Sequence, residues 1–329
     1  MLRTSSATKT YEALASAFHV YSLPGKALLF GEYGMLLGFT GVAVTLPTFR
    51  MQVSCAMQHA TMTPAIHVYS TFLKTGHIVL TLDSLEEEGF FQSTLAPYKD
   101  VLRQFYENGE DLIVFVEKSF PPHLGMGSSS ALLASLHTFL FDSLYQGRES
   151  PLASSVFFHN LHESLKRIQG TGSGYDATLQ LASQELAHPQ LWRYQRSSTD
   201  SLPEFSPISG LHGHYGTILA THLYAETKTA LARFSEEKHF IYARVHGALA
   251  EAFLKDPHPD NLSAFITKAQ DIQKQQGILP DIDLIRNLHK AGIPFKSLGA
   301  GFGDCLWSPW TACQLHAFRK HIVTEIVLP

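Results

Sequence analysis

The chain is poor in cysteine and in charge, and it has no long hydrophobic run. Its three cysteines, Cys55, Cys305 and Cys313, are too few and too scattered for a disulfide framework or a paired-cysteine metal site, which favours a reducing, cytoplasmic environment. Charged residues make up 16% of the chain, against roughly 25% in an average domain. The apolar stretch 27–49 is interrupted by Glu32 and glycines, so it fails the roughly 20-residue criterion for a membrane span.

The charges that are present nearly balance. There are 25 Lys and Arg against 29 Asp and Glu, a net charge of −4, and no basic cluster, which argues against a nucleic-acid partner. The 18 histidines stand singly, without metal-ligand spacing, so no histidine metal site is predicted. The 45% apolar content and the length of 329 residues are typical of a globular protein with one large or two ordinary domains.

Hydrophobic periodicity predicts a sheet-rich first third followed by mixed structure. Strands are expected at residues 26–30, 42–46, 51–56, 65–69, 77–82 and 111–117, with helices at 93–108, 128–145 and 151–169 and regular structure at 176–183. A polar, proline-bearing linker is expected at 197–213, then a strand at 215–223 and helices at 228–254 and 261–276. The pattern predicts an α+β protein with domains at 1–200 and 201–329.

The most informative segment is residues 121–133, PPHLGMGSSSALL, which leads into a predicted helix. Its glycines and hydroxyls are Gly125, Gly127, Ser128, Ser129 and Ser130. Glycine lets the main chain approach a ligand closely, and the free N–H groups and dipole of a helix start favour an anion. The alternative is a plain serine cap after a glycine turn. The segment has neither the Walker A spacing nor the dinucleotide-binding glycine pattern directly after a strand.

Two further glycine-rich segments accompany it: residues 24–33, PGKALLFGEY, and residues 297–305, SLGAGFGDC. A fourth run, QGTGSGYD, occupies residues 169–176. Glycine-rich segments spread over the whole chain suggest one composite site.

These segments resemble the motifs of the GHMP kinase superfamily, in the expected order and nearly from end to end. The central turn is similar to that family's ATP-phosphate loop, with Met126 where leucine is usual. The resemblance implies an N-terminal domain like domain 2 of ribosomal protein S5, a ferredoxin-like C-terminal domain and an active site between them. It also implies ATP and Mg²⁺ as cofactors, a small-molecule acceptor and no membrane or nucleic-acid partner, and it leaves a homodimer open.

Within that family, the GEY, GTGSGYD and GDC variants resemble the phosphomevalonate kinases of the isoprenoid pathway. The implied activity is transfer of the ATP γ-phosphoryl group to phosphomevalonate. The alternative is mevalonate, because Lys26, Lys228 and Lys296 are few cations for a phosphorylated acceptor, and because Leu298 replaces a usual hydroxyl residue. A non-catalytic nucleotide or metabolite sensor is the third reading, and the retained Asp176 argues against it.

The resemblance assigns Asp176 as the catalytic aspartate and Lys26 as the cation beside the acceptor and the transferring phosphoryl group. Carboxylates commonly orient the acceptor hydroxyl in kinases, and a cation there stabilises transition-state charge. The alternatives are a helix N-cap for Asp176 and a solvated strand-edge charge for Lys26.

The other assignments concern metal, nucleotide and acceptor. Ser129 is expected to face Mg²⁺, while Ser128 and Ser130 bind phosphate or cap the helix. The family's second metal carboxylate has no counterpart, since Leu165 stands at its position and Glu163 is out of register. The acceptor pocket is assigned to Glu32, Tyr33, Ser173, Gly299, Ala300 and Gly301.

Overall fold

The computed structural model describes residues 18–70, 73, 75–118, 124–170, 172–197, 201–223, 236–298 and 304–329. Three assigned acceptor residues, Gly299, Ala300 and Gly301, lie outside this part, as does Lys228. No helix of the described residues is long and apolar enough to span a membrane.

The larger sheet has seven strands in the order β4-β3-β5-β2-β6-β7, with β1 paired to β2. All its strand pairs are antiparallel except β3 with β5. The strands are β1 (His19–Phe30), β2 (Gly41–His59), β3 (Ile66–Ser70), β4 (His77–Leu80), β5 (Glu110–Lys118), β6 (Gln190–Gln195) and β7 (Glu204–Pro207).

Two sequence predictions for this sheet are wrong in detail. The strands expected at 42–46 and 51–56 form the single strand β2, because β1 pairs with both halves and absorbs the offset in a register shift between Pro24 and Gly25. The linker expected at 197–213 contains β7, which pairs with β6. The first sheet therefore extends past residue 200, and the division of the chain at that residue stays a prediction.

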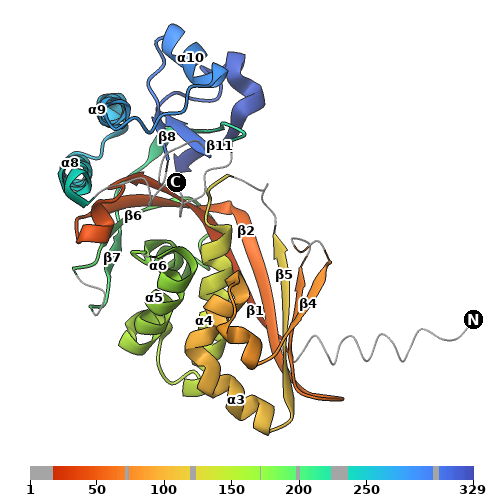
Figure 1. Ribbon diagram of the computed structural model, residues 1–329. Helices are drawn as coiled ribbons and strands as arrows, with labels where there is room; N and C mark the ends of the chain where they lie inside the picture. The colour runs from red at the N-terminus through yellow and green to blue at the C-terminus, as the bar shows by residue number, and fades with distance from the viewer. Residues whose placement is uncertain are drawn as a thin grey trace, which may run out of the picture.

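Helices cover one face of the larger sheet (Figure 1). They are α2 (Phe90–Leu95), α3 (Lys99–Glu107), α4 (Ser128–Tyr145), α5 (Ser155–Gln169) and α6 (Tyr175–Ala182), with short 3₁₀ turns η1 (Gly34–Leu37), η2 (Asp83–Glu86), η3 (Ala96–Tyr98) and η4 (Pro151–Ala153). The helix expected at 93–108 is interrupted at η3, where Pro97 has no N–H to donate. Helix α4 is buried on all sides from residue 131 to residue 141 and forms the centre of the core.

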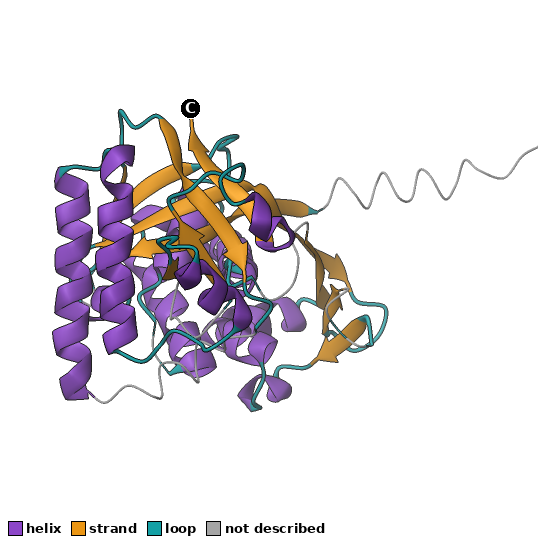
Figure 2. Cartoon of the chain, turned by 90° about the horizontal axis from the view of Figure 1, so that it is seen from above, coloured by secondary structure: helices purple, strands orange, loops and turns teal. Residues whose placement is uncertain are grey.

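The second sheet has four strands in the order β11-β8-β10-β9. Its elements are β8 (Gly213–Ala220), α8 (Glu236–Lys255), η5 (Pro259–Asn261), α9 (Leu262–Gln275), α10 (Asp283–Lys290), β9 (Lys296–Ser297), β10 (Cys305–Ser308), η6 (His316–His321) and β11 (Ile322–Leu328). Figure 2 shows the long helices α8 and α9 side by side next to the strands. The mixture of two sheets and packed helices confirms the predicted α+β class.

The two sheets share one hydrophobic cluster. Phe30 at the end of β1 lies 5.0 Å from Phe253 of α8 and 5.3 Å from Trp307 of β10, measured between ring centroids. Ala27 and Leu29 of β1 belong to the same cluster. Burial of apolar surface between the sheets therefore holds them together at the strand that carries Lys26.

Candidate active site

The segment expected to bind phosphate, here called the serine turn (residues 124–130), leads into α4. Gly127 is the N-cap residue, with a left-handed φ of 84°. A Cβ atom at Gly127 would lie 2.7 Å from Cε of Lys26, so only glycine fits this approach. The main-chain N–H of Lys26 donates to the carbonyl of Met126 at 3.0 Å. Strand β1 and the serine turn are thus joined through main chain and side chain.

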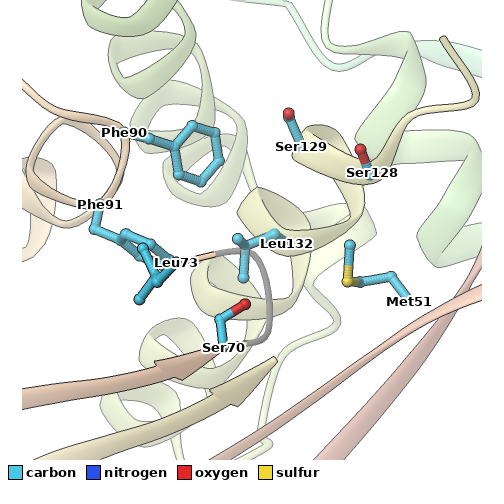
Figure 3. Close-up of a pocket in the computed structure, with 8 residues that line it drawn as sticks. All are labelled: Met51, Ser70, Leu73, Phe90, Phe91, Ser128, Ser129 and Leu132. Atoms are coloured by element: carbon cyan, nitrogen blue, oxygen red, sulfur yellow. The ribbon is translucent and has the colours of Figure 1, made fainter. Parts of the chain in front are cut away.

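The three serines of the turn point in different directions. Ser130 Oγ lies 2.9 Å from the Gly127 carbonyl and 2.8 Å from Gln180 Oε1, so this hydroxyl is occupied by the protein itself. Ser128 and Ser129 line a cavity of about 220 Å³. Figure 3 shows these two hydroxyls opposite Phe90 and Phe91. The first turn of α4 therefore presents hydroxyls and free N–H groups beside an open space.

The cavity is mostly apolar apart from its serines. Its lining residues are Met51, Ser70, Leu73, Phe90, Phe91, Ser128, Ser129 and Leu132. An apolar pocket with a few convergent polar groups is the usual form of a small-molecule site. Aromatic side chains on one wall and a helix start on the other suit a ligand with a flat ring and an anionic group.

Lys26 and Asp176 form an ion pair, although 150 residues separate them in the sequence. Their side chains are 9% and 32% exposed, so the aspartate is open to solvent on one side. Lys26 Nζ also donates to the Tyr175 hydroxyl at 2.9 Å. Burial and the neighbouring Asp176 hold the pKa of Tyr175 well above its usual range, so this hydroxyl stays neutral.

The helix-cap alternative for Asp176 is wrong. The N-cap of α6 is Gly174, with φ at 76°, and Asp176 lies inside the first turn with its carboxylate directed at Lys26. The surface-charge alternative for Lys26 is also wrong, because the residue is 7% exposed. A carboxylate in a first turn is favoured by the helix dipole.

Gln180, one turn after Asp176, is a site residue that sequence reasoning missed. Its buried amide nitrogen donates to the carbonyls of Pro24 at 2.7 Å and Gly127 at 3.0 Å. It therefore connects α6, β1 and the serine turn. The only signal in the sequence was its position at i+4 from Asp176, which places both on one helix face.

Glu32 and Tyr33, assigned to the acceptor pocket, are both buried. The Glu32 carboxylate forms an ion pair with Lys296 and lies 3.2 Å from Nδ1 of His246. Burial alone would raise the pKa of Glu32, but Lys296 and His246 outweigh that effect and bring it below its usual range. The role of Glu32 in acceptor binding stays a prediction, with its carboxylate turned to these two partners.

Ser173 lies on the turn before α6. Its carbonyl accepts a hydrogen bond from the Tyr194 hydroxyl at 2.6 Å, and its own Oγ accepts from the Tyr175 N–H at 3.4 Å. Arg196, which is 6% exposed, places a guanidinium nitrogen 3.7 Å from where a Cβ of Gly174 would stand. The turn before α6, which leads to Asp176, thus accepts a hydrogen bond from Tyr194 of β6 and lies close to Arg196, just after β6.

The third glycine-rich segment is described at its two ends. Asp304 lies against the serine turn, since a Cβ at Gly125 would stand 2.6 Å from Asp304 Oδ2. Cys305 Sγ lies 3.2 Å from the Leu124 carbonyl, and burial raises the pKa of this thiol. Cys305 therefore contacts the serine turn as a buried, protonated thiol, which is the expected structural role.

Divalent-metal binding depends on the oxygen donors near the turn. No group of three or more His, Cys, Asp or Glu side chains suited to a metal ion occurs among the described residues. The Ser129 hydroxyl and the partly exposed Asp176 carboxylate are the oxygen ligands that Mg²⁺ accepts when substrate phosphates and water complete its shell. The residues present fit such an ion, and Ser129 as its ligand stays a prediction.

Comparison with known proteins shows which chains this one is similar to. No family model matches the chain. A mevalonate kinase from Aeropyrum pernix is 23% identical over 294 residues, which cover 87% of this chain and 86% of that protein. The structure of the Methanococcus jannaschii mevalonate kinase matches with a TM-score of 0.66 at 16% identity, over 94% of this chain and 98% of that one.

A third similar protein is the Streptococcus pneumoniae phosphomevalonate kinase in complex with phosphomevalonate and AMPPNP. It matches with a TM-score of 0.67 at 14% identity, and the match covers 94% of this chain and 100% of that one. The chain thus has the two-domain fold of the GHMP kinase superfamily. Within that superfamily it resembles the mevalonate-pathway branch, and its neighbours include kinases of both acceptors.

Proposed function

We propose that the chain is an ATP-dependent kinase of the mevalonate pathway that transfers the γ-phosphoryl group of ATP to phosphomevalonate. The carrying observation is the Lys26–Asp176 ion pair, which lies directly beside the glycine and serine residues of the serine turn. A kinase needs positioning, a cation for the transferring phosphoryl group and a group that orients the acceptor. In this proposal the serine turn, Lys26 and Asp176 supply these three.

The nucleotide is proposed to lie along the cavity and the serine turn. Phe90 and Phe91 would contact the base, while Ser128, Ser129 and the first N–H groups of α4 would hold the phosphates. Bound Mg²⁺ would neutralise phosphate charge, with Ser129 as a protein ligand. Lys26, paired with Asp176, is proposed to stabilise the charge that develops on the γ-phosphoryl oxygens.

Asp176 is proposed to orient the acceptor oxygen in line with the γ-phosphoryl group. One P–O bond to the leaving ADP breaks as the acceptor oxygen forms a new P–O bond. Tyr33, Asp304 and the run GTGSGYD favour phosphomevalonate as the acceptor, because these residues resemble the motifs of the phosphomevalonate kinases. Asp304 lies against the serine turn, and Tyr33 follows Glu32 directly in the sequence.

Mevalonate is the second candidate acceptor, and the fate of Lys296 favours it. This lysine is one of the few cations near the motifs, but it is 0% exposed and paired with Glu32. Lys296 is therefore not available to bind the phosphate group that phosphomevalonate carries. In that case Asp176 would accept the proton that the mevalonate hydroxyl loses as it attacks.

The test is a coupled ADP-release assay with purified protein and Mg²⁺-ATP, run in parallel with phosphomevalonate and with mevalonate. Turnover on phosphomevalonate alone is expected. Turnover on mevalonate alone would replace the first acceptor by the second. Silence on both, with nucleotide still bound, would overturn both proposed acceptors and favour another acceptor or a sensor. The Asp176→Asn variant serves as the blank for contaminating ATPase.

A further inference from the structure

Three ionisable side chains form a sealed cluster where the two sheets meet, here called the ionic joint: Glu32, Lys296 and His246. Their side chains are 1%, 0% and 0% exposed. Glu32 pairs with Lys296 through Oε1 and approaches His246 Nδ1 at 3.2 Å through Oε2. Lys296 Nζ also donates to the Leu29 carbonyl of β1 at 2.6 Å. The joint therefore combines a charge pair with a main-chain contact.

The joint connects the two outer glycine-rich segments of the chain. Glu32 stands two residues after β1, the strand that carries Lys26. Lys296 opens β9, which runs toward the third segment at residues 297–305. His246 comes from α8, a third element. Segments more than 260 residues apart in sequence thus meet at one ion pair, since Lys296 and Glu32 are separated by 264 positions.

Close packing keeps the joint in place. A Cβ at Gly34 would lie 2.9 Å from the Ala243 carbonyl, and a Cβ at Gly247 would lie 2.7 Å from Cβ of Phe39. The two glycines therefore allow α8 to pack at van der Waals distance against η1 and against Phe39, which follows η1, close to His246 in the sequence of α8. Tyr33, next to Glu32, has a left-handed φ of 59°. A tyrosine in that region is strained, and such strain persists where the surroundings over-determine it.

The opposite side of β9 is held as well. Gln273 of α9 donates to the Ser297 carbonyl and accepts from the Ser297 N–H, both at 2.8 Å. Lys296 ties β9 to β1 through its side chain, and Ser297 ties β9 to α9 through its main-chain N–H and carbonyl. Strand β9 is consequently held by one side chain and by its main chain at the start of the third glycine-rich segment.

We propose that the ionic joint positions the active site, by fixing the strand that carries Lys26 relative to the strand that leads into the third glycine-rich segment. In this proposal Glu32, Lys296 and His246 act as positioning residues, through their contacts with one another and with β1. A buried ion pair adds little net stability over a well-packed apolar pair, but it requires a specific geometry between its charged groups that apolar contacts do not. The inference rests on the proposed kinase function for its activity readout.

The test compares Glu32→Gln, Lys296→Met and the double variant. Each single variant leaves an unpaired buried charge or polar group, so its melting temperature falls. The double variant removes both charges, and its melting temperature recovers toward wild type. If the joint positions the site, kcat of the double variant stays about 10²-fold below wild type, with the KM for ATP little changed. Recovery of kcat together with stability would overturn the proposal.

Hydrogen exchange gives a readout that does not depend on the reaction. In the double variant, amides of residues 29–33 and 296–298 are expected to exchange faster, while α4 is unchanged. Unchanged exchange at both strands would overturn the joint even if the kinase function holds. Absence of turnover in wild type would instead overturn the kinase proposal on which the activity readout rests.

A matched control is the exposed pair Glu86 and Lys99, whose side-chain N and O atoms lie 2.7 Å apart. The pair Glu86→Gln and Lys99→Met removes the same two charges from a surface site. Its kcat, melting temperature and exchange are expected to match wild type. A loss of kcat in this control comparable to that of the joint variant would show that the effect belongs to net charge, and would overturn the proposal.

Discussion

The molecule contains two lysine–carboxylate pairs near β1 that differ in one property, access to solvent. In the pair Lys26–Asp176 the side chains are 9% and 32% exposed, and in the pair Lys296–Glu32 they are 0% and 1% exposed. Both lysines contact the same strand, Lys26 as a member of β1 and Lys296 through the Leu29 carbonyl. The same chemical pair thus occurs once beside a cavity and once in a sealed core.

The difference follows from the elements that present each carboxylate. Asp176 lies on the first turn of α6, after a glycine turn, and one side of it stays open. Glu32 lies between η1, α8 and β9, which close over it. A solvent-accessible ion pair can separate and bind a substrate. A buried ion pair can only keep the segments that carry its two residues in place. We therefore expect substitutions in the first pair to act on chemistry and substitutions in the second to act on stability and geometry.

The largest effect is expected for Asp176→Asn. The amide keeps the shape of the side chain but can neither accept a proton nor balance Lys26, so kcat should fall by about 10²- to 10⁴-fold. Affinity for nucleotide should stay near wild type, because the nucleotide is proposed to lie along the serine turn. Steady-state kinetics and ADP titration measure the two quantities. Near-normal turnover would remove Asp176 from the mechanism.

The second prediction sets Lys296→Met against Lys26→Met. The first leaves the Glu32 charge buried beside His246 without Lys296, and should lower the free energy of unfolding by about 3–5 kcal/mol. The second leaves Asp176 partly solvated and should cost clearly less, about 1–3 kcal/mol, in urea unfolding at neutral pH. Equal losses would mean that exposure does not separate the two pairs.

Another buried ionisable side chain, the histidine His137, allows the effect of burial to be tested by changing the pH. His137 of α4 is fully buried between the Tyr98 hydroxyl at 2.8 Å and Ser164 Oγ at 2.9 Å, and burial lowers its pKa from 6.5 to about 3. The folded state therefore stays neutral here while the unfolded state takes up a proton below pH 6.5. Stability is fully present above that pH and is lost as the pH falls toward 3.

The expected slope is about 1.4 kcal/mol per pH unit at most. It is measured as the difference in unfolding free energy between pH 6 and pH 5, in wild type and in His137→Gln. The variant should lack this part of the slope, although it is less stable throughout. The same slope in both proteins would mean that another group causes the acid sensitivity.

The smallest effects separate two neighbouring hydroxyls of the serine turn. Ser129→Ala should raise the Mg²⁺ concentration needed for half-maximal turnover by about tenfold, the loss of one ligand contact. Ser130→Ala should leave that concentration unchanged and cost about 1 kcal/mol of stability, because its hydroxyl contacts Gly127 and Gln180. An unchanged Mg²⁺ requirement in Ser129→Ala would place the metal ligand elsewhere.

The local elements were the predictable part of the fold. Helix α4 begins and ends at the residues expected from its hydrophobic run and its glycine start, 128 and 145. Elements with weak periodicity were missed, among them α10, β6 and the short strands β9 and β10. A two-residue strand such as β9 has no pattern of its own and forms because β10 and α9 lie beside it.

The site divides in the same way. From the sequence alone, the glycine and serine residues could be recognised as a helix start. The family resemblance in the sequence singled out Lys26 and Asp176. It could not determine that Glu32 faces Lys296 and His246, or that Gln180 joins three elements. Residue types and local spacing set backbone geometry within a few positions. Whether a charge is open or sealed depends on which distant segments pack over it, and only the tertiary structure decides that.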